Sequence, residues 1–162
     1  MEYHQFKNDL LQCIENGKNQ GKISDFINSI LEQDPSKSFS YRKASFSILK
    51  NDKKNLAVDI IEPAIPNLDN KFLSVVKDRV YDLIKSGQED KRTVLKKVLL
   101  REIEIDFHKN MSTQDESTAL IILSKQLDTH PYLSQTIYRR LARFYHKKNI
   151  NLYNTLRNKL QE

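Results

Sequence analysis

The stretch that decides the fold is 119-ALIILSKQLDTHPYLSQTIYRRLARFY-145, in which two apolar runs flank the tetrapeptide at 128–131. Apolar side chains recur at helical spacing in both runs, so the stretch predicts two helices. Pro131 suits the first turn of a helix, because the backbone N–H that proline lacks has no partner there. A new helix is therefore expected to begin near Pro131, after a short connection.

Two interpretations of the second helix are open. In a helix-turn-helix protein, the helix over 132–146 would enter the major groove of DNA and carry Arg139, Arg140 and Arg143 there. That motif needs a tight turn, often with glycine, and the tetrapeptide at 128–131 has none. The alternative is that the helix is one arm of a repeated helical hairpin, and the rest of the chain favours this second interpretation.

Helical spacing of apolar residues continues through all 162 residues, in about nine or ten short segments. The one alternating run, EIEIDF at 102–107, has no second strand-like run to pair with. Pro63 is expected to shorten or kink its helix, and Ser112 or Thr113 to cap the start of another. Short connections make neighbouring helices antiparallel. The sequence thus predicts an all-α chain of antiparallel hairpins, either stacked as a short solenoid or packed as an irregular bundle.

Composition limits the remaining possibilities. The chain is long enough for one domain, 1–162, with a real core. A lone Cys13 cannot form an intramolecular disulfide, and its place beside apolar residues predicts a packing role. No apolar run approaches the roughly 18 to 20 residues that a membrane span needs, and no signal peptide is recognisable. We therefore expect a soluble, cytoplasmic protein that does not enter a membrane.

Charge is distributed unevenly along the chain. Residues 129–161 contain seven basic residues and no acidic one, whereas the 20 basic and 20 acidic residues of 1–128 cancel. The formal net charge of +6 therefore comes from the C-terminal fifth. A patch of one sign favours anionic partners, although it also suits a solvated end of the fold. The basic residues are Arg139, Arg140, Arg143, Lys147, Lys148, Arg157 and Lys159.

Two parts of the chain share an order of side-chain sizes at the same spacing. In each part a tyrosine is followed by a medium, a small and a large residue on one helix face. These residues are Tyr41, Ala44, Ser45 and Ile48 in one part, and Tyr138, Leu141, Ala142 and Tyr145 in the other. A facing stripe accompanies each, on Ala57, Ile61 and Ala64, and on Ala119, Leu123 and Gln126 followed by Pro131. The pattern resembles the tetratricopeptide repeat, a helical hairpin of about 34 residues.

The resemblance implies stacked units near 3–37, 38–71, 72–102 and 103–135, with a partial unit at 136–160. Small residues at the centre of each hairpin let the two helices approach closely. The resemblance also implies a concave face, lined by the first helix of each unit, that holds a peptide segment of another protein.

On this register, nine residues beside the packing positions would line that face. They are Phe39, Arg42, Lys43, Phe46, Arg139, Arg140, Arg143, His146 and Lys147. Guanidinium groups bind carboxylates and aromatic rings supply buried area, so the expected partner is an acidic, partly apolar segment. An ordinary core is the commoner role for the two phenylalanines, ahead of ligand contact. The sequence predicts a non-enzymatic scaffold or adaptor that binds protein.

Nucleic acid is the alternative partner. Tyr138, Phe144, Tyr145 and Tyr153 are interleaved with the C-terminal basic residues, as backbone contacts with base stacking would require. On the repeat register, however, Tyr138 and Tyr145 are packing residues, which leaves fewer rings for bases.

Patterns of catalysis are sparse. The chain has no glycine-rich phosphate loop, no HExxH and no CxxC. Within REIEIDFH at 101–108, Glu102 with Asp106 and Glu104 with His108 are spaced four residues apart, which could form half a metal site or an acid–base pair. Solvated ion pairs on a helix face are the commoner meaning of such spacing. We expect no metal, no cofactor and no enzymatic activity.

Overall fold

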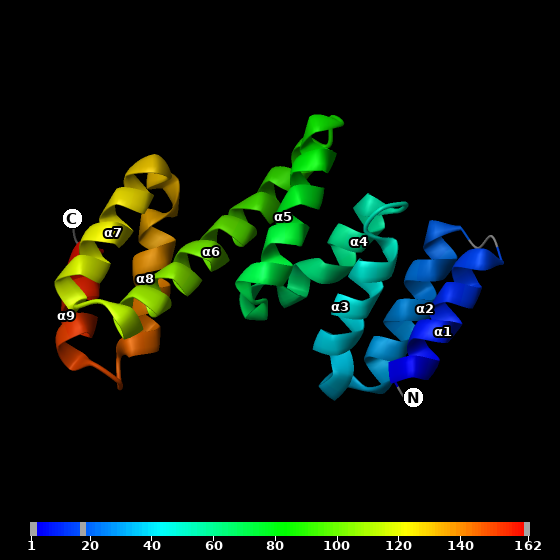
Figure 1. Cartoon of the computed structure of the whole chain (residues 1–162), viewed down its shortest axis with the longest axis horizontal. Helices are drawn as coiled ribbons and strands as arrows, with labels where there is room; N and C mark the ends of the chain where they lie inside the picture. The colour runs from blue at the N-terminus through cyan, green and yellow to red at the C-terminus, as the bar shows by residue number, and fades with distance from the viewer. Residues whose placement is uncertain (1–2, 17–18, 161–162) are drawn as a thin grey trace. The chain divides into compact units, whose positions relative to one another are not determined.

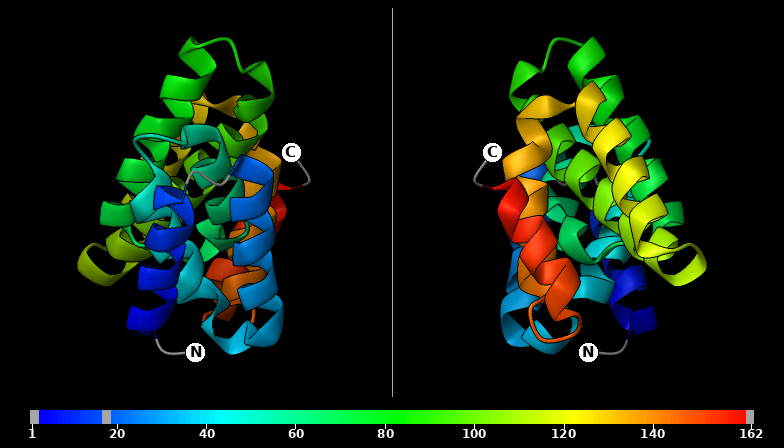
Figure 2. Two further views of the ribbon diagram at one scale, coloured as in Figure 1. Left: turned by 90° about the vertical axis from the view of Figure 1, so that its right-hand side faces the viewer. Right: turned by 90° about the vertical axis from the view of Figure 1, so that its left-hand side faces the viewer.

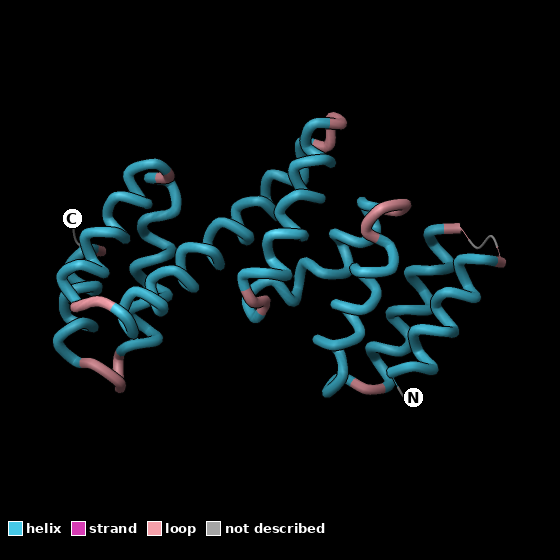
Figure 3. The backbone as a smooth tube through the Cα atoms, viewed as in Figure 1, coloured by secondary structure: helices cyan, strands magenta, loops and turns pink. Residues whose placement is uncertain are grey.

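The computed structural model describes residues 3–16 and 19–160, and every regular element in these ranges is helical (Figures 1 and 3). The all-α class predicted from the sequence is confirmed. The α-helices are α1 (Tyr3–Glu15), α2 (Gln20–Gln33), α3 (Ser38–Leu49), α4 (Lys54–Ile61), α5 (Asn70–Lys85), α6 (Arg92–Thr113), α7 (Glu116–Thr129), α8 (Ser134–Tyr145) and α9 (Ile150–Lys159). Short 3-10 helices are η1 (Pro35–Lys37), η2 (Glu62–Asn67), η3 (Glu89–Lys91) and η4 (Pro131–Leu133).

The chain divides into two compact units, Met1–Leu95 and Lys96–Glu162. Unit 1 contains α1 to α5, and unit 2 contains most of α6 together with α7, α8 and α9. Each unit is described by itself below. A single repeat domain over the whole chain stays a prediction.

Asparagine and aspartate side chains cap four of the helices. Each accepts a hydrogen bond from the backbone N–H three residues later, which satisfies a donor that the first turn leaves without a partner. The caps are Asn19, Asp69, Asp115 and Asn149. The predicted cap at Ser112 or Thr113 is wrong. Both residues lie in the last turn of α6, where their hydroxyls donate to the carbonyl oxygen of Lys109.

Prolines end helices where the sequence predicts. Helix α4 ends at Ile61, two residues before Pro63 in η2, because proline offers no N–H to continue the α-helical ladder. Pro131 opens η4, directly before α8, as the connection at 128–131 predicts.

Unit 1 is held together by aromatic stacking and by close helix packing. The ring of Phe6 on α1 stacks on Tyr41 of α3, with centroids 4.4 Å apart, and lies 6.1 Å from the ring of Phe26 on α2. The helices α1 and α2 pack side by side with α3 against both (Figure 2, left). Ala44 and Ala57 are buried where α3 and α4 meet, as the hairpin prediction requires.

Unit 2 has its own core. The helices α8 and α9 pack closely against each other, with Ala142, Leu152 and Leu156 buried (Figure 2, right). The Phe107 ring of α6 lies 5.9 Å from the Tyr145 ring of α8 and is fully buried. Ala142, the small residue predicted at the centre of this hairpin, is buried.

Three of the predicted unit boundaries, near 71/72, 102/103 and 135/136, fall inside helices. The sequence register places a unit boundary near 102/103, yet α6 runs without interruption from Arg92 to Thr113. The segment contains no proline or glycine that would end it. The predicted boundary near 135/136 likewise falls just inside α8. The stacking of hairpins into a solenoid stays a prediction.

Candidate functional site

An open hollow of about 250 Å³ lies between α3 and α5 of unit 1. We call it the aromatic hollow; its lining residues are Phe46, Ser47, Lys50, Asp69, Lys71, Phe72 and Val75. The buried Phe46 ring lies 5.5 Å from the Phe72 ring, which is partly exposed and supplies apolar surface to the hollow. Lysine side chains stand at its border, so the hollow combines apolar area with positive charge.

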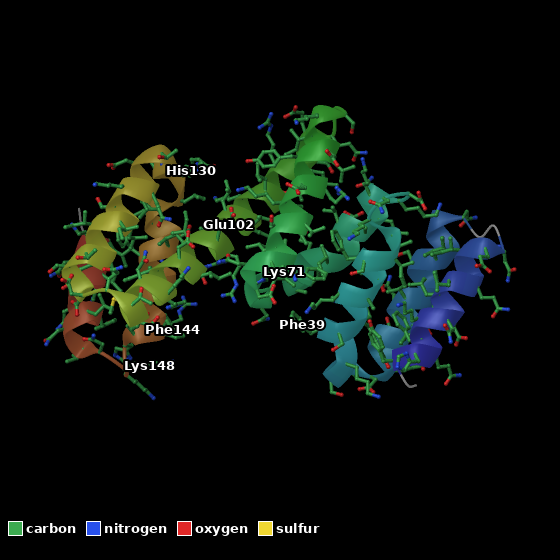
Figure 4. The ribbon with its side chains drawn as sticks, in the orientation of Figure 1. Phe39, Lys71, Glu102, His130, Phe144 and Lys148 are labelled. Carbon is green, nitrogen blue, oxygen red and sulfur yellow. The ribbon has the colours of Figure 1, made fainter. Side chains whose placement is uncertain are left out.

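Lys43 adds a third ammonium group at this border. Its Nζ lies 5.3 Å from the centroid of the Phe39 ring and 5.0 Å from that of Phe72, a distance at which a cation is attracted to the ring face. Phe39 is 38 % exposed and extends from α3 on the side where Lys71 of α5 lies (Figure 4). Phe39 and Lys43 thus extend the aromatic hollow along α3.

Two predicted binding residues of unit 1 have structural roles instead. The Arg42 guanidinium donates hydrogen bonds to the Ile60 carbonyl oxygen at 2.7 Å and to the Ser38 hydroxyl at 3.3 Å. It satisfies a carbonyl in the last turn of α4 that the helix leaves without a partner, and burial lowers the pKa of Arg42. Phe46 is only 1 % exposed, so it forms the floor of the hollow and belongs mainly to the core.

A second open hollow, of about 330 Å³, lies between α8 and α9 of unit 2. We call it the arginine pocket. Helix α8 contributes Arg139, Ala142, Arg143 and His146, and the α9 segment contributes Tyr153, Arg157 and Leu160. The spacings of three and four residues place each set on one helix face. Buried Ala142 keeps the two helices close, so the two faces meet at the pocket.

The three arginines of this pocket have no ion pair with any carboxylate in residues 3–16 and 19–160. Their neighbour Arg140 differs, because it turns to α6 and donates to Glu104 at 2.8 Å. The His146 ring meets the Tyr153 ring edge to face, with centroids 4.6 Å apart, which holds both at one side of the pocket.

Of the C-terminal residues predicted to bind a partner, some line the arginine pocket and others do not. It brings Arg139, Arg143 and His146 together in the arginine pocket, whereas Arg140 is a packing residue and Lys147 is exposed outside the lining. Sequence reasoning did not assign Tyr153 and Arg157 to this site. These two residues are spaced four apart on the following helix, which places them on one face, and this spacing could have indicated their part in the site.

In unit 1, Lys50, Lys71 and Phe72 were also missed. They lie just outside the register positions used for prediction, at the end of α3 and the start of α5. A lysine and a phenylalanine adjoin the predicted unit boundary at 71/72, and this pairing was the available indication of a binding site.

The carboxylates and the histidine at 101–108 contact neighbouring helices. Gln126 of α7 donates to Asp106 at 3.1 Å, and the His108 Nδ1 lies 2.7 Å from the Tyr145 hydroxyl. Burial lowers the pKa of His108; Glu104 opposes this effect and Arg101 and Lys148 add to it. Burial raises the pKa of Tyr145. Glu104, Asp106 and His108 thus join α6 to α7 and α8.

No cluster of three or more His, Cys, Asp or Glu side chains suited to a metal ion occurs in the part of the chain that the structure describes. In the same residues, no helix combines the length and apolar character needed to cross a membrane.

Comparison with protein-family models, with curated proteins and with solved structures found no match to this chain. The resemblance to the tetratricopeptide repeat therefore stays a prediction from the sequence, and function has to be argued from the two hollows.

Proposed function

We propose that this protein is a tetratricopeptide-like, non-enzymatic adaptor that holds an acidic, partly apolar segment of a partner protein at the aromatic hollow. The observation that carries the proposal is the part-exposed Phe72 ring and the exposed Phe39 ring, with lysines at the border of one open hollow whose floor is Phe46. Apolar side chains of the partner would bury area against the rings, and its carboxylates would meet Lys50 and Lys71.

Charge favours an acidic partner over a neutral one. Three lysines border the hollow and its extension, against the single carboxylate of Asp69. The Asp69 carboxylate already accepts a hydrogen bond from the Phe72 N–H. It thereby caps the start of α5, whose first N–H groups have no partner within the helix. Exposed ion pairs contribute little singly, so the lysines select the partner and the rings supply most of the affinity.

The test is a titration of the full chain with a fluorescent peptide that contains phenylalanine flanked by glutamates. We expect saturable binding, and about tenfold weaker binding by the Lys50→Gln/Lys71→Gln variant, since two charge-assisted contacts are lost. The matched control is Lys7→Gln/Lys22→Gln, which removes the same charge from exposed sites on α1 and α2. Equal weakening by both variants would show that net charge alone attracts the peptide.

Nucleic acid binding is the second candidate, and one observation favours it. Phe144 is 45 % exposed, and the Lys148 Nζ lies 3.7 Å from its ring centroid (Figure 4). An exposed ring beside a cation can stack on a base while the cation meets a phosphate. A steep dependence of oligonucleotide affinity on salt, without saturable binding of the acidic peptide, would favour this candidate.

A further inference from the structure

The arginine pocket concentrates more positive charge than one carboxylate can balance. Arg139, Arg143 and Arg157 face one hollow of about 330 Å³, with His146 beside them. Like charges repel one another, and none of these three arginines forms an ion pair with a carboxylate of the described residues. If these charges served only to keep this end of the protein solvated, they could be spread over the surface. Their position in one pocket instead indicates that they bind an anionic ligand.

We infer that the arginine pocket binds a phosphate monoester on a side chain of a partner protein. A phosphate monoester carries a charge of about −1.5 to −2 at pH 7 and three acceptor oxygens, which matches several guanidinium groups converging from two helices. Each guanidinium can donate two parallel hydrogen bonds to a phosphate. The inference uses residues of unit 2 alone and does not rest on the function proposed for the aromatic hollow.

The apolar part of the pocket indicates what accompanies the phosphate. Ala142, Leu160 and the Tyr153 ring belong to the same lining as the arginines. They can cover the carbon atoms of a phosphorylated side chain while the arginines hold its oxygens. The pocket is therefore built for a small organic phosphate rather than for a bare ion.

Nucleic acid fits this pocket less well. Internal phosphates of nucleic acids are diesters with one charge each, spaced along a strand, and a track of separated cations suits them better than one convergent hollow. The Tyr153 ring is in edge-to-face contact with the His146 ring, so a base that stacked on it would compete with His146. We therefore argue for a phosphorylated protein and leave an oligonucleotide as an outcome of the test.

The experiment titrates the full chain with phenyl phosphate, a dianionic monoester, and with methyl phenyl phosphate, the monoanionic diester of similar size, by calorimetry at pH 7.5. We expect one binding site and affinity about tenfold higher for the monoester, because one charge is lost in the diester. A phosphoserine peptide and an oligonucleotide without terminal phosphates are then compared as competitors. The phosphopeptide should displace phenyl phosphate and the oligonucleotide should not.

Matched variants locate the site. Arg139→Gln/Arg157→Gln should weaken phenyl phosphate binding at least about tenfold, whereas Lys109→Gln/Lys125→Gln, with the same loss of charge at exposed sites outside the pocket, should leave it within about twofold. Helicity by circular dichroism verifies that each variant is folded. Absence of binding, equal affinity for the diester, equal weakening by both variants or displacement by the oligonucleotide would each overturn the inference.

Discussion

The aromatic hollow and the arginine pocket differ in what surrounds their charges. In the aromatic hollow of unit 1, lysines stand beside phenylalanine rings, and the Lys43 ammonium lies over two of them. In the arginine pocket of unit 2, three arginines line one hollow together with Ala142, Leu160 and the Tyr153 ring. The first arrangement suits a segment that buries apolar side chains, and the second suits a compact, highly charged group. Both attract anions, yet they are expected to select different ones.

The largest expected effect is on the free energy of unfolding, and it tests whether the buried aromatic residues stabilise unit 1. Tyr41→Ala removes a ring that is 1 % exposed and stacks on Phe6, so the free energy of unfolding should fall by about 3 to 5 kcal/mol. Urea denaturation followed by circular dichroism measures the change. Tyr81→Ala, at an exposed tyrosine of α5, should cost less than about 0.5 kcal/mol. Similar losses in both variants would contradict the packing of unit 1.

The next prediction separates two neighbouring arginines of unit 2. Arg140→Gln leaves the part-buried Glu104 carboxylate without its cation, which should cost about 1 to 2 kcal/mol of unfolding free energy. Arg139→Gln removes a charge from the arginine pocket and should change stability by less than about 0.5 kcal/mol. Thermal denaturation of both variants measures the difference in stability. The double variant Arg140→Gln/Glu104→Gln should regain part of the lost unfolding free energy, because no unpaired carboxylate remains. If it regained none, the Arg140–Glu104 pair would not contribute to stability.

A smaller effect is expected at the edge of the aromatic hollow. Phe39→Ala truncates a ring that is 38 % exposed, so it should leave the fold intact while weakening the acidic peptide about threefold to tenfold. Fluorescence anisotropy gives the affinity. Phe144→Ala, which truncates an exposed ring of unit 2, is the matched control and should leave peptide affinity unchanged. If the two variants behaved alike, the peptide would not be held at the aromatic hollow.

The smallest expected effect concerns pH. Burial holds the pKa of His108 below its ordinary value, so its neutral form is favoured in the folded state. The resulting stability is present above the unfolded-state pKa of about 6.5 and is lost as the pH falls through the lower folded-state pKa. Unfolding free energy measured from pH 7.5 to pH 5 should therefore decrease more steeply in the wild type than in His108→Gln. Parallel slopes would rule out this role for His108.

The helical class was predictable because its signals are local. Apolar spacing, Pro63 and Pro131 together indicate where helices lie and where two of them begin or end. The end of α6 was harder to predict, because Ser112 and Thr113 are good caps in sequence but instead bond back to Lys109 inside the last turn. The choice between these two roles depends on how far the preceding helix extends, and no breaker residue precedes them.

The candidate sites were predictable only in part, for a similar reason. The unbalanced charge of 129–161 pointed to Arg139 and Arg143, because charge is visible in composition. Arg42 and Arg140 look the same in the sequence, yet their partners lie 18 and 36 residues away on other helices. Such contacts are decided by tertiary packing, so the sequence could not separate a packing arginine from a free one.

The central claim is that the two hollows bind different anionic ligands, and nuclear magnetic resonance tests it most directly. Backbone amide shifts of the full, isotope-labelled chain are followed during separate titrations with the acidic phenylalanine peptide and with phenyl phosphate. The account predicts that the peptide shifts amides of 39–50 and 69–75, whereas phenyl phosphate shifts those of 139–146 and 153–160. Shifts by both ligands at the same amides, or by neither at these residues, would contradict it.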